Sequence, residues 1–171
     1  MKLMPDTQAP ALSLPLVGGG TWTLSERTPE AFSMIVVYRG LHCPVCETYL
    51  GKLQAVAKDF AAKGVDLVAI SMDPAERAEK AKADWGLTDV PIAYGLGEAD
   101  ARAWGLWISK SIKEVEIDVF PEPGTFWVRP DGRLYLIDIA SLPFARPDLD
   151  ILLSKVGAMA NGYPARGTHA G

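Results

Sequence analysis

The chain contains two cysteines, Cys43 and Cys46, separated only by Pro44 and Val45. A disulfide between them would close a very short loop, and the stabilisation that loop closure gives grows with loop length. A structural cross-link is therefore a poor explanation for the pair. Two thiols at this spacing are typical of a redox-active dithiol or of a metal site.

The sequence around the cysteines predicts a strand followed by a helix. Residues 33–38 are a continuous apolar run, typical of a strand covered on both faces. From residue 45 the apolar side chains recur on one helical face, and Gly64 is a suitable C-terminal stop. Pro44 suits the first helical position, because it has no N–H to leave unpaired. Cys43 is then the expected N-cap, and Cys46 lies in the first turn.

This placement has a chemical consequence for the thiols. The free N–H groups and the positive dipole end of a helix N-terminus favour a thiolate, which is the form that attacks disulfides and peroxides. We expect Cys43 to be the more exposed thiol with the lower pKa, and Cys46 to attack the mixed disulfide that Cys43 forms. The residues thus favour a thiol–disulfide oxidoreductase with Cys43 as nucleophile, Cys46 as resolving cysteine and Pro44 stiffening the pair.

Two other interpretations of the pair stay open, namely inert buried side chains and a metal site. Soft ligands are scarce, since the only histidines are His42 and His169, and we expect no metal or cofactor. A covalent haem would need a histidine after the second cysteine. His42 either promotes the neighbouring thiolate or is a solvated loop residue. Four arginines are expected to be solvated, namely Arg39, Arg129, Arg146 and Arg166. Arg146 and Arg166 lie in loops that can fold over a site.

The remaining patterns predict an α/β fold with a mixed central sheet, helices on both faces and an N-terminal β-hairpin. The predicted strands are 12–17, 21–24, 65–71, 91–94, 125–128 and 134–139. Besides the helix that starts at Pro44, three helices are predicted. The first runs from Pro74 to about residue 85, and the others cover 98–105 and 149–160. Asp73, with Pro74 and Glu76 behind it, is the expected cap of the first of these helices, and Asp148 caps the last. Residues 106–120 fit a strand or a continued helix equally.

Composition limits the class of protein. A chain of 171 residues with ordinary apolar and charged fractions fits one domain, 1–171, with a flexible Gly-rich segment at 161–171. A net charge of −4 without a basic run argues against nucleic acid as the main partner. No apolar stretch is long enough to span a membrane, and the start lacks the pattern of a secretory signal. We therefore expect a cytoplasmic protein.

Four segments carry a resemblance to a known family. They read APALSL (9–14), YRGLHCPVC (38–46), GTFWVRPDGRL (124–134) and YPARG (163–167). Together they resemble the peroxiredoxin-like, CxxC-containing branch of the AhpC/TSA (redoxin) family in the thioredoxin superfamily. The resemblance implies a thioredoxin fold, an antioxidant oxidoreductase activity and a thiol reductant as partner. It also places Pro123 where redox thioredoxin folds carry a cis-proline that faces the cysteines and shapes the substrate groove.

The departures from that family change the expected chemistry. By the resemblance Cys46 aligns with the peroxidatic cysteine, but Arg39 replaces the loop proline and Cys43 the threonine. Pro123 stands where the activating arginine would be, so donors that polarise a peroxide are missing and efficient peroxidase activity is not expected. The strand at 33–38 also lacks the buried acid of thioredoxin, for which Glu47 is a weak substitute.

Three functions follow from the sequence. The first is the disulfide oxidoreductase, with His42, Pro44 and Pro123 beside the substrate. The second is an atypical thiol peroxidase in which Cys46 is oxidised and Cys43 resolves it. The third is a non-catalytic module that binds a partner or a metal. The expected partners are thiols and disulfides of proteins or small molecules, hydroperoxides in the second case, and a second copy of the chain in a homodimer.

Overall fold

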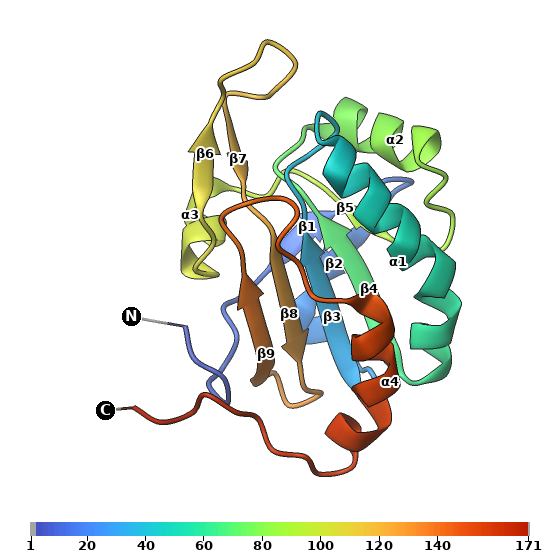
Figure 1. Cartoon of the computed structure of the whole chain (residues 1–171), viewed down its shortest axis with the longest axis vertical. Helices are drawn as coiled ribbons and strands as arrows, with labels where there is room; N and C mark the ends of the chain where they lie inside the picture. Colours follow the sequence, from blue (N-terminus) through green and yellow to red (C-terminus); the bar gives the residue numbers. More distant parts are fainter. Residues whose placement is uncertain (1–2, 171) are drawn as a thin grey trace.

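The computed structural model describes residues 3–170, and a five-stranded sheet of order β5-β4-β3-β8-β9 lies at its centre (Figure 1). Strands β3, β4 and β5 are parallel, whereas β8 runs antiparallel to β3 and to β9. This is the mixed sheet that the sequence predicted. Its strands are β3 (Phe32–Val37), β4 (Val65–Ile70), β5 (Ile92–Ala93), β8 (Gly124–Val128) and β9 (Leu134–Ile139).

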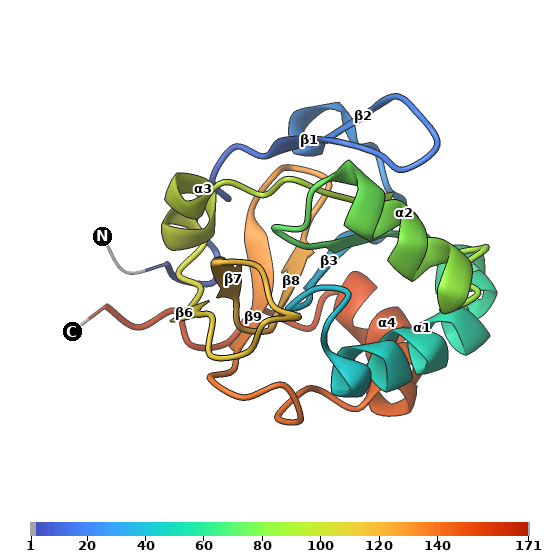
Figure 2. The ribbon, with the colours of Figure 1, turned by 90° about the horizontal axis from the view of Figure 1, so that it is seen from above.

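Helices cover both faces of this sheet, as predicted. One apolar cluster joins it to α1 (Pro44–Ala62), α2 (Ala75–Asp84) and α4 (Leu149–Ala160). A second cluster joins its other face to α3 (Glu98–Ala103) and to the hairpin of β1 (Ser13–Pro15) and β2 (Thr21–Thr23). Figure 2 shows this hairpin on the side of the sheet away from α1 and α4. A short 3₁₀ turn, Leu24–Glu26, follows β2.

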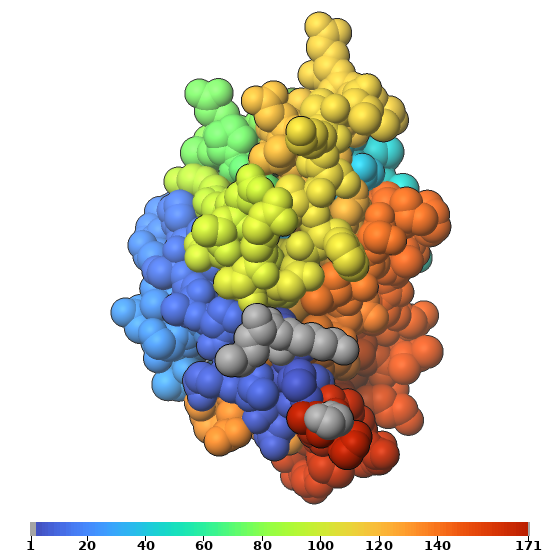
Figure 3. All heavy atoms as spheres, turned by 90° about the vertical axis from the view of Figure 1, so that its left-hand side faces the viewer, coloured from blue at the N-terminus to red at the C-terminus, as the bar shows by residue number. Residues whose placement is uncertain are grey.

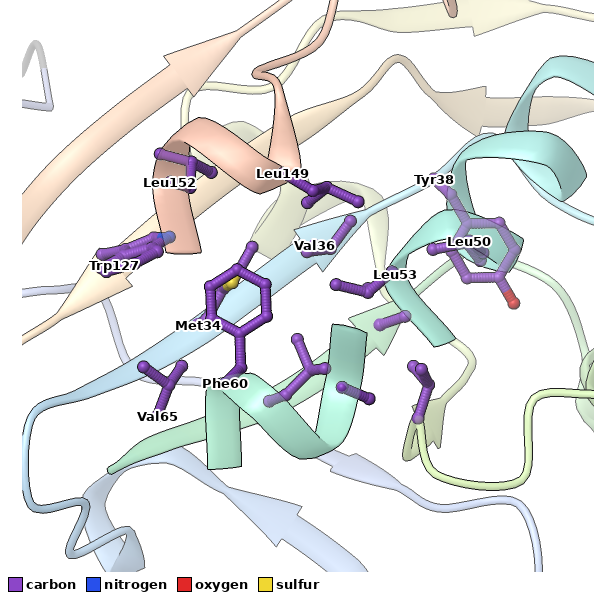
Figure 4. Close-up of a cluster of buried hydrophobic side chains, with 14 of the residues drawn as sticks. Met34, Val36, Tyr38, Leu50, Leu53, Phe60, Val65, Trp127, Leu149 and Leu152 are labelled. Atoms are coloured by element: carbon purple, nitrogen blue, oxygen red, sulfur yellow. The ribbon is translucent and has the colours of Figure 1, made fainter. Parts of the chain in front are cut away.

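The two clusters exist because β3 is apolar on both faces. Side chains alternate along a strand, so Met34 and Val36 belong to the cluster under α1, while Ile35 and Val37 belong to the other. In Figure 4 labelled side chains of α1 and α4 lie around Met34 and Val36 of β3. This packing holds the N-terminus of α1 at the carboxyl end of β3.

Of the two structures that the sequence left open for residues 106–120, the continued helix is not found, and strand forms at two short stretches of the segment. They form a short antiparallel pair, β6 (Ile108–Lys110) and β7 (Val119–Pro121), joined by a loop that projects from the molecule (Figures 1 and 3). Of the alternating residues Val115, Ile117 and Val119, only Val119 pairs in a strand, because the loop before it buries no face: Val115 is 62% exposed. Among the nearby aromatics, Trp104 is buried and Trp107 is exposed.

The segment after α4 runs along the sheet. The Tyr135 hydroxyl donates a hydrogen bond to the carbonyl oxygen of Tyr163 at 2.9 Å, and Ala165 is buried. These contacts do not test the predicted flexibility, which stays a prediction, as does the single-domain assignment. No helix in residues 3–170 is long and apolar enough to cross a membrane.

The core gives a first test. Phe60 on α1 is fully buried, with its ring centroid 6.2 Å from that of Trp127 on β8. We expect Phe60→Ala to lower the free energy of unfolding by about 3–5 kcal/mol, because it removes apolar contacts and leaves a cavity. Urea titration followed by tryptophan fluorescence measures the loss. The matched control is Phe144→Ala at a side chain that is 70% exposed, which should change stability by about 0.5 kcal/mol or less. Equal losses in the two variants would contradict the packing described above.

Candidate active site

The dithiol lies at the N-terminus of α1. Cys43 is the N-cap, and its sulfur accepts a hydrogen bond from the backbone N–H of Cys46 at 3.2 Å. Pro44 is the first helical residue, as the sequence predicted, so this end of α1 has one backbone donor fewer to satisfy. Each cysteine is a free thiol. The cap geometry aims a backbone dipole and an N–H group at the Cys43 sulfur, which favours its thiolate.

Burial of the dithiol is deeper than expected. Cys43 is 2% exposed and Cys46 is fully buried, so Cys43 is the more exposed thiol as predicted, although only slightly. Both residues belong to the apolar cluster between α1 and the sheet, which includes Tyr38 at the end of β3 and Leu50 on α1. A reactant can reach either sulfur only when neighbouring side chains move, or when it is small.

Arg146 is a site residue that the sequence reasoning missed. It lies in the loop between β9 and α4, which arches beside the tip of β3 in Figure 1. Its Nη2 donates a hydrogen bond to the Cys46 sulfur at 3.0 Å, and its guanidinium lies 4.8 Å from the ring centroid of Tyr49. The Tyr49 hydroxyl in turn donates to the Pro147 carbonyl oxygen at 2.8 Å. Arg146 is therefore held at the dithiol rather than solvated.

The two thiols are driven to opposite protonation states. The pKa of Cys43 is lowered to about 6, first by the hydrogen bond from the Cys46 thiol, and further by the backbone N–H of Cys46, Arg39 and Arg146. The pKa of Cys46 is raised, first by burial and then by its hydrogen bond to Cys43, against the opposing effect of Arg146. At neutral pH the pair therefore shares one negative charge, centred on Cys43.

The loop before Cys43 is held by a buried carboxylate. Asp73 accepts a hydrogen bond from the Leu41 backbone N–H at 2.8 Å and pairs with Arg77 at 3.1 Å. It does not cap α2 as predicted: Pro74 is the N-cap and no side chain bonds there. The carboxylate turns to the loop because Gly40, at φ 136°, brings the backbone so close that a Cβ would lie 2.8 Å from an Asp73 oxygen.

A second set of side chains lies where the loop before Cys43 meets β7. The Arg39 guanidinium stacks over Phe120 at 4.7 Å from its centroid, and its Nε lies 3.4 Å from Glu122 Oε2. The His42 ring also packs on Phe120, at 4.7 Å between centroids. Burial first, and then Arg39, lowers the pKa of His42 below its ordinary value, so the ring is neutral at neutral pH. Its role toward substrate stays a prediction.

The other predicted residues divide into three groups. The peptide bond before Pro123 is trans, so the cis-proline expected from the resemblance is absent, although Pro123 is buried. Glu47 and Arg166 are exposed. Arg129 was expected to be solvated, but it pairs with Asp6 at 2.8 Å and lies over Tyr135. Within residues 3–170 no cluster of three or more histidine, cysteine or acidic side chains is arranged to hold a metal ion.

A cavity of about 650 Å³ opens between α1 and the loop that carries Arg146, and neither cysteine lines it. Its walls are the exposed side of the first α1 turns and the loop that carries Arg146. Val45, between the two cysteines, and Arg146 both line it, together with Phe144. The cavity therefore reaches the residues that surround Cys46.

Comparison with solved structures identifies the architecture. Similar structures include a peroxiredoxin-like protein from Aquifex aeolicus, with 18% identity and a TM-score of 0.76 over 93% of this chain and 89% of that one. Peroxiredoxin Q from Xanthomonas campestris gives 23% identity and a TM-score of 0.66 over 87% and 91% of the two chains. Reduced Prx3 from Vibrio vulnificus, solved in complex with hydrogen peroxide, has 14% identity and a TM-score of 0.76 over 91% of this chain and 99% of that one. The chain thus has the thioredoxin fold of peroxiredoxins, as the resemblance implied.

The family follows from the sequence comparison. The profile of the AhpC/TSA family matches residues 5–137. The chain belongs to the AhpC/TSA family. No curated protein sequence matches it at a significant level.

The hydrogen bond that the Cys46 thiol donates predicts the titration of Cys43. In the reduced protein, thiolate absorbance in the far ultraviolet should rise with pH around a midpoint of about 6, so that roughly a tenth of Cys43 is ionised one pH unit below the midpoint. Cys46→Ala should move the midpoint up toward the ordinary thiol value, because it removes the thiol donor. Cys43→Ala is the control and should abolish the step. A midpoint that stays near 6 in Cys46→Ala would contradict the assigned cause.

Proposed function

We propose that this protein is a thiol–disulfide oxidoreductase in which Cys43 is the nucleophile and Cys46 the resolving cysteine. The observation that carries the proposal is the N-cap geometry, in which the Cys43 sulfur accepts the Cys46 N–H at 3.2 Å. The thiolate is the attacking species, and a thiol with a pKa of about 6 is mostly ionised at neutral pH. An optimum attacking thiol has a pKa near the ambient pH, which this site approaches.

The reaction proceeds in two exchange steps. The Cys43 thiolate attacks one sulfur of the substrate disulfide, forms a mixed disulfide and releases the other sulfur as a thiolate, which takes a proton from solvent. Cys46 then loses its proton and attacks the Cys43 sulfur, which forms the Cys43–Cys46 disulfide and releases the second substrate thiol. An external thiol reductant returns both cysteines to the reduced state, so the electrons balance over the cycle.

Electrostatics favour this order of events. While Cys43 is a thiolate, it raises the pKa of Cys46 through its charge and through the hydrogen bond that it accepts. Formation of the mixed disulfide removes both effects, whereas the Arg146 guanidinium stays 3.0 Å from the Cys46 sulfur. Cys46 is then easier to ionise, when its attack is needed. The first step therefore prepares the second.

The proposal extends to the surroundings of the dithiol. His42, Pro44 and Pro123 are proposed to contact the substrate, since His42 and Pro44 flank Cys43 in sequence and Pro123 follows the buried Glu122. We propose a cytoplasmic location for the chain, because two free thiols and a thiol reductant suit a reducing compartment. The chain is proposed to act as one domain, which the match over 5–137 supports.

One observation favours a second candidate function, a thiol peroxidase with Cys46 as peroxidatic cysteine. The sequence lacks the family's activating arginine at position 123, but Arg146 brings a guanidinium to the Cys46 sulfur. Cys46 thiolate would attack one peroxide oxygen and become a sulfenic acid, while the other oxygen leaves as water or alcohol after protonation. Cys43 would then displace water from the sulfenic acid and form the disulfide. The peroxide-bound Prx3 neighbour has a similar fold.

Two cysteine variants test the disulfide oxidoreductase. After reaction with bis(2-hydroxyethyl) disulfide, Cys46→Ser should carry one mercaptoethanol adduct on Cys43, because the resolving thiol is missing. Cys43→Ser should react at least about a hundredfold more slowly, since the remaining thiol is buried and its pKa is raised. Intact-protein mass spectrometry with peptide mapping measures both. The proposal fails if Cys43→Ser forms the adduct as fast as Cys46→Ser does.

Hydrogen peroxide tests the second candidate. Stopped-flow tryptophan fluorescence should show oxidation of the wild type faster than that of free cysteine, and Arg146→Gln should lower the rate constant by about 10²-fold, because a donor to the developing charge is lost. Arg166→Gln, at an exposed arginine, is the control for charge removal and should leave the rate unchanged. Oxidation no faster than that of free cysteine would exclude a peroxidase.

A further inference from the structure

Arg39 is a preorganised cation next to the reactive thiol. Its guanidinium lies over the Phe120 ring and its Nε lies 3.4 Å from Glu122, so two residues of the β7 segment fix its position. Glu122 is itself held by the Ser109 hydroxyl, which donates to Oε1 at 2.6 Å. The Arg39 side chain is only 20% exposed. A guanidinium fixed in this way loses little conformational entropy when it binds an anion.

The hydrogen-bonding capacity of this cation is unused. Within residues 3–170 the buried Nε of Arg39 has no hydrogen-bond partner, and the Glu122 Oε2 that it faces at 3.4 Å is farther away than in a good charge-assisted bond. Glu122 Oε2 and both ring nitrogens of His42 are also buried without a hydrogen-bond partner. Buried polar groups in native proteins almost always have partners. Arg39 and the His42 ring, which follows it in the loop before Cys43, therefore keep nitrogen atoms free to bind a ligand.

The charge around Cys43 is positive in balance. Arg39 and Arg146 both lower the pKa of Cys43. One buried carboxylate, Glu122, faces Arg39 at 3.4 Å and offsets part of this charge. Two other acids nearby have partners of their own. Asp73 pairs with Arg77, and Glu116 accepts the backbone N–H groups of Ile112 and Lys113. An anionic reactant is therefore attracted to this site, and a cationic one is repelled.

Burial limits the size of that reactant. Cys43 is 2% exposed, so a folded protein disulfide cannot reach its sulfur without rearrangement, whereas a small molecule needs only side-chain movement. We infer that the substrates are low-molecular-weight disulfides that carry carboxylate groups, and that Arg39 binds one such carboxylate while Cys43 attacks the disulfide. This inference rests on the proposed function, because it takes Cys43 as the attacking sulfur. The exchange step and its electron balance are unchanged.

A set of small disulfides that differ in charge tests the inference. The probes are 3,3′-dithiodipropionate as anion, bis(2-hydroxyethyl) disulfide as neutral reference and cystamine as cation. Single-turnover rate constants for Cys46→Ser, which stops at the mixed disulfide, are measured by stopped-flow fluorescence and mass spectrometry. Rates with free cysteine correct for the intrinsic reactivity of each probe. After this correction we expect the rate constant to be highest for the anion, lower for the neutral probe and lowest for the cation. The rate constant of the anion should exceed that of the neutral probe about tenfold or more.

The decisive quantity is the anion-to-neutral ratio in Arg39 variants made in the same background. Each variant also changes the pKa of Cys43, but the thiolate fraction cancels in a ratio taken on one protein. Arg39→Gln should reduce the ratio about tenfold, to near unity. Arg39→Lys should keep part of the preference, because the charge remains while the two-nitrogen fork is lost. Arg166→Gln should leave the ratio unchanged.

The outcomes separate this inference from the proposed function. If all three probes react at Cys43 but the ratio is near unity, or is the same in Arg39→Gln, recognition by Arg39 is wrong and the oxidoreductase stands. Recognition by Arg39 is equally wrong if Arg39→Lys retains no more preference than Arg39→Gln. If no probe forms an adduct on Cys43, the proposed function itself fails. A ratio that also falls with rising salt, as expected for a charge interaction, supports the inference.

Discussion

The site depends on one hydrogen bond, from the backbone N–H of Cys46 to the sulfur of Cys43. It forms because Pro44 starts α1 directly after Cys43, so that the cysteine takes the position of an N-cap. The same bond directs the positive end of α1 toward one sulfur and leaves the other one turn inward. The asymmetry between the two thiols follows from the hydrogen bond of the Cys46 thiol to Cys43 and the burial of Cys46, together with this cap, and the packing of α1 on β3 holds the cap in place.

A buried thiolate also needs opposite charge, and distant parts of the chain supply it. Arg39 comes from the loop before α1 and is ordered by Phe120 and Glu122, which belong to or follow β7. Arg146 comes from the loop before α4 and is ordered by Tyr49. In a medium of low dielectric constant, such cations have a larger effect on a thiolate than they would in water. The arrangement thus combines burial, which excludes bulky reactants, with ionisation, which burial alone would oppose.

The sequence predicted most of the fold because its signals are local. The apolar run of β3, the helical spacing of α1 and the cap at Asp148 each act within a few residues, and all three are found as predicted. The failures arise where a distant partner decides. Asp73 has the residue type of a helix cap, but Leu41 and Arg77 bind its carboxylate instead. Val115, Ile117 and Val119 alternate like a strand, yet of these three only Val119 finds a pairing partner.

By itself, the sequence determined the position of the dithiol on a helix N-terminus, because proline and the helical repeat act over neighbouring residues. The folded chain decided which charges surround it. Nothing local distinguishes Arg146, held against Cys46 from 100 positions away, from the exposed Arg166. The side chains that tune a reactive sulfur act through space at about 3 to 5 Å. Such proximity exists only after the strands and loops have packed.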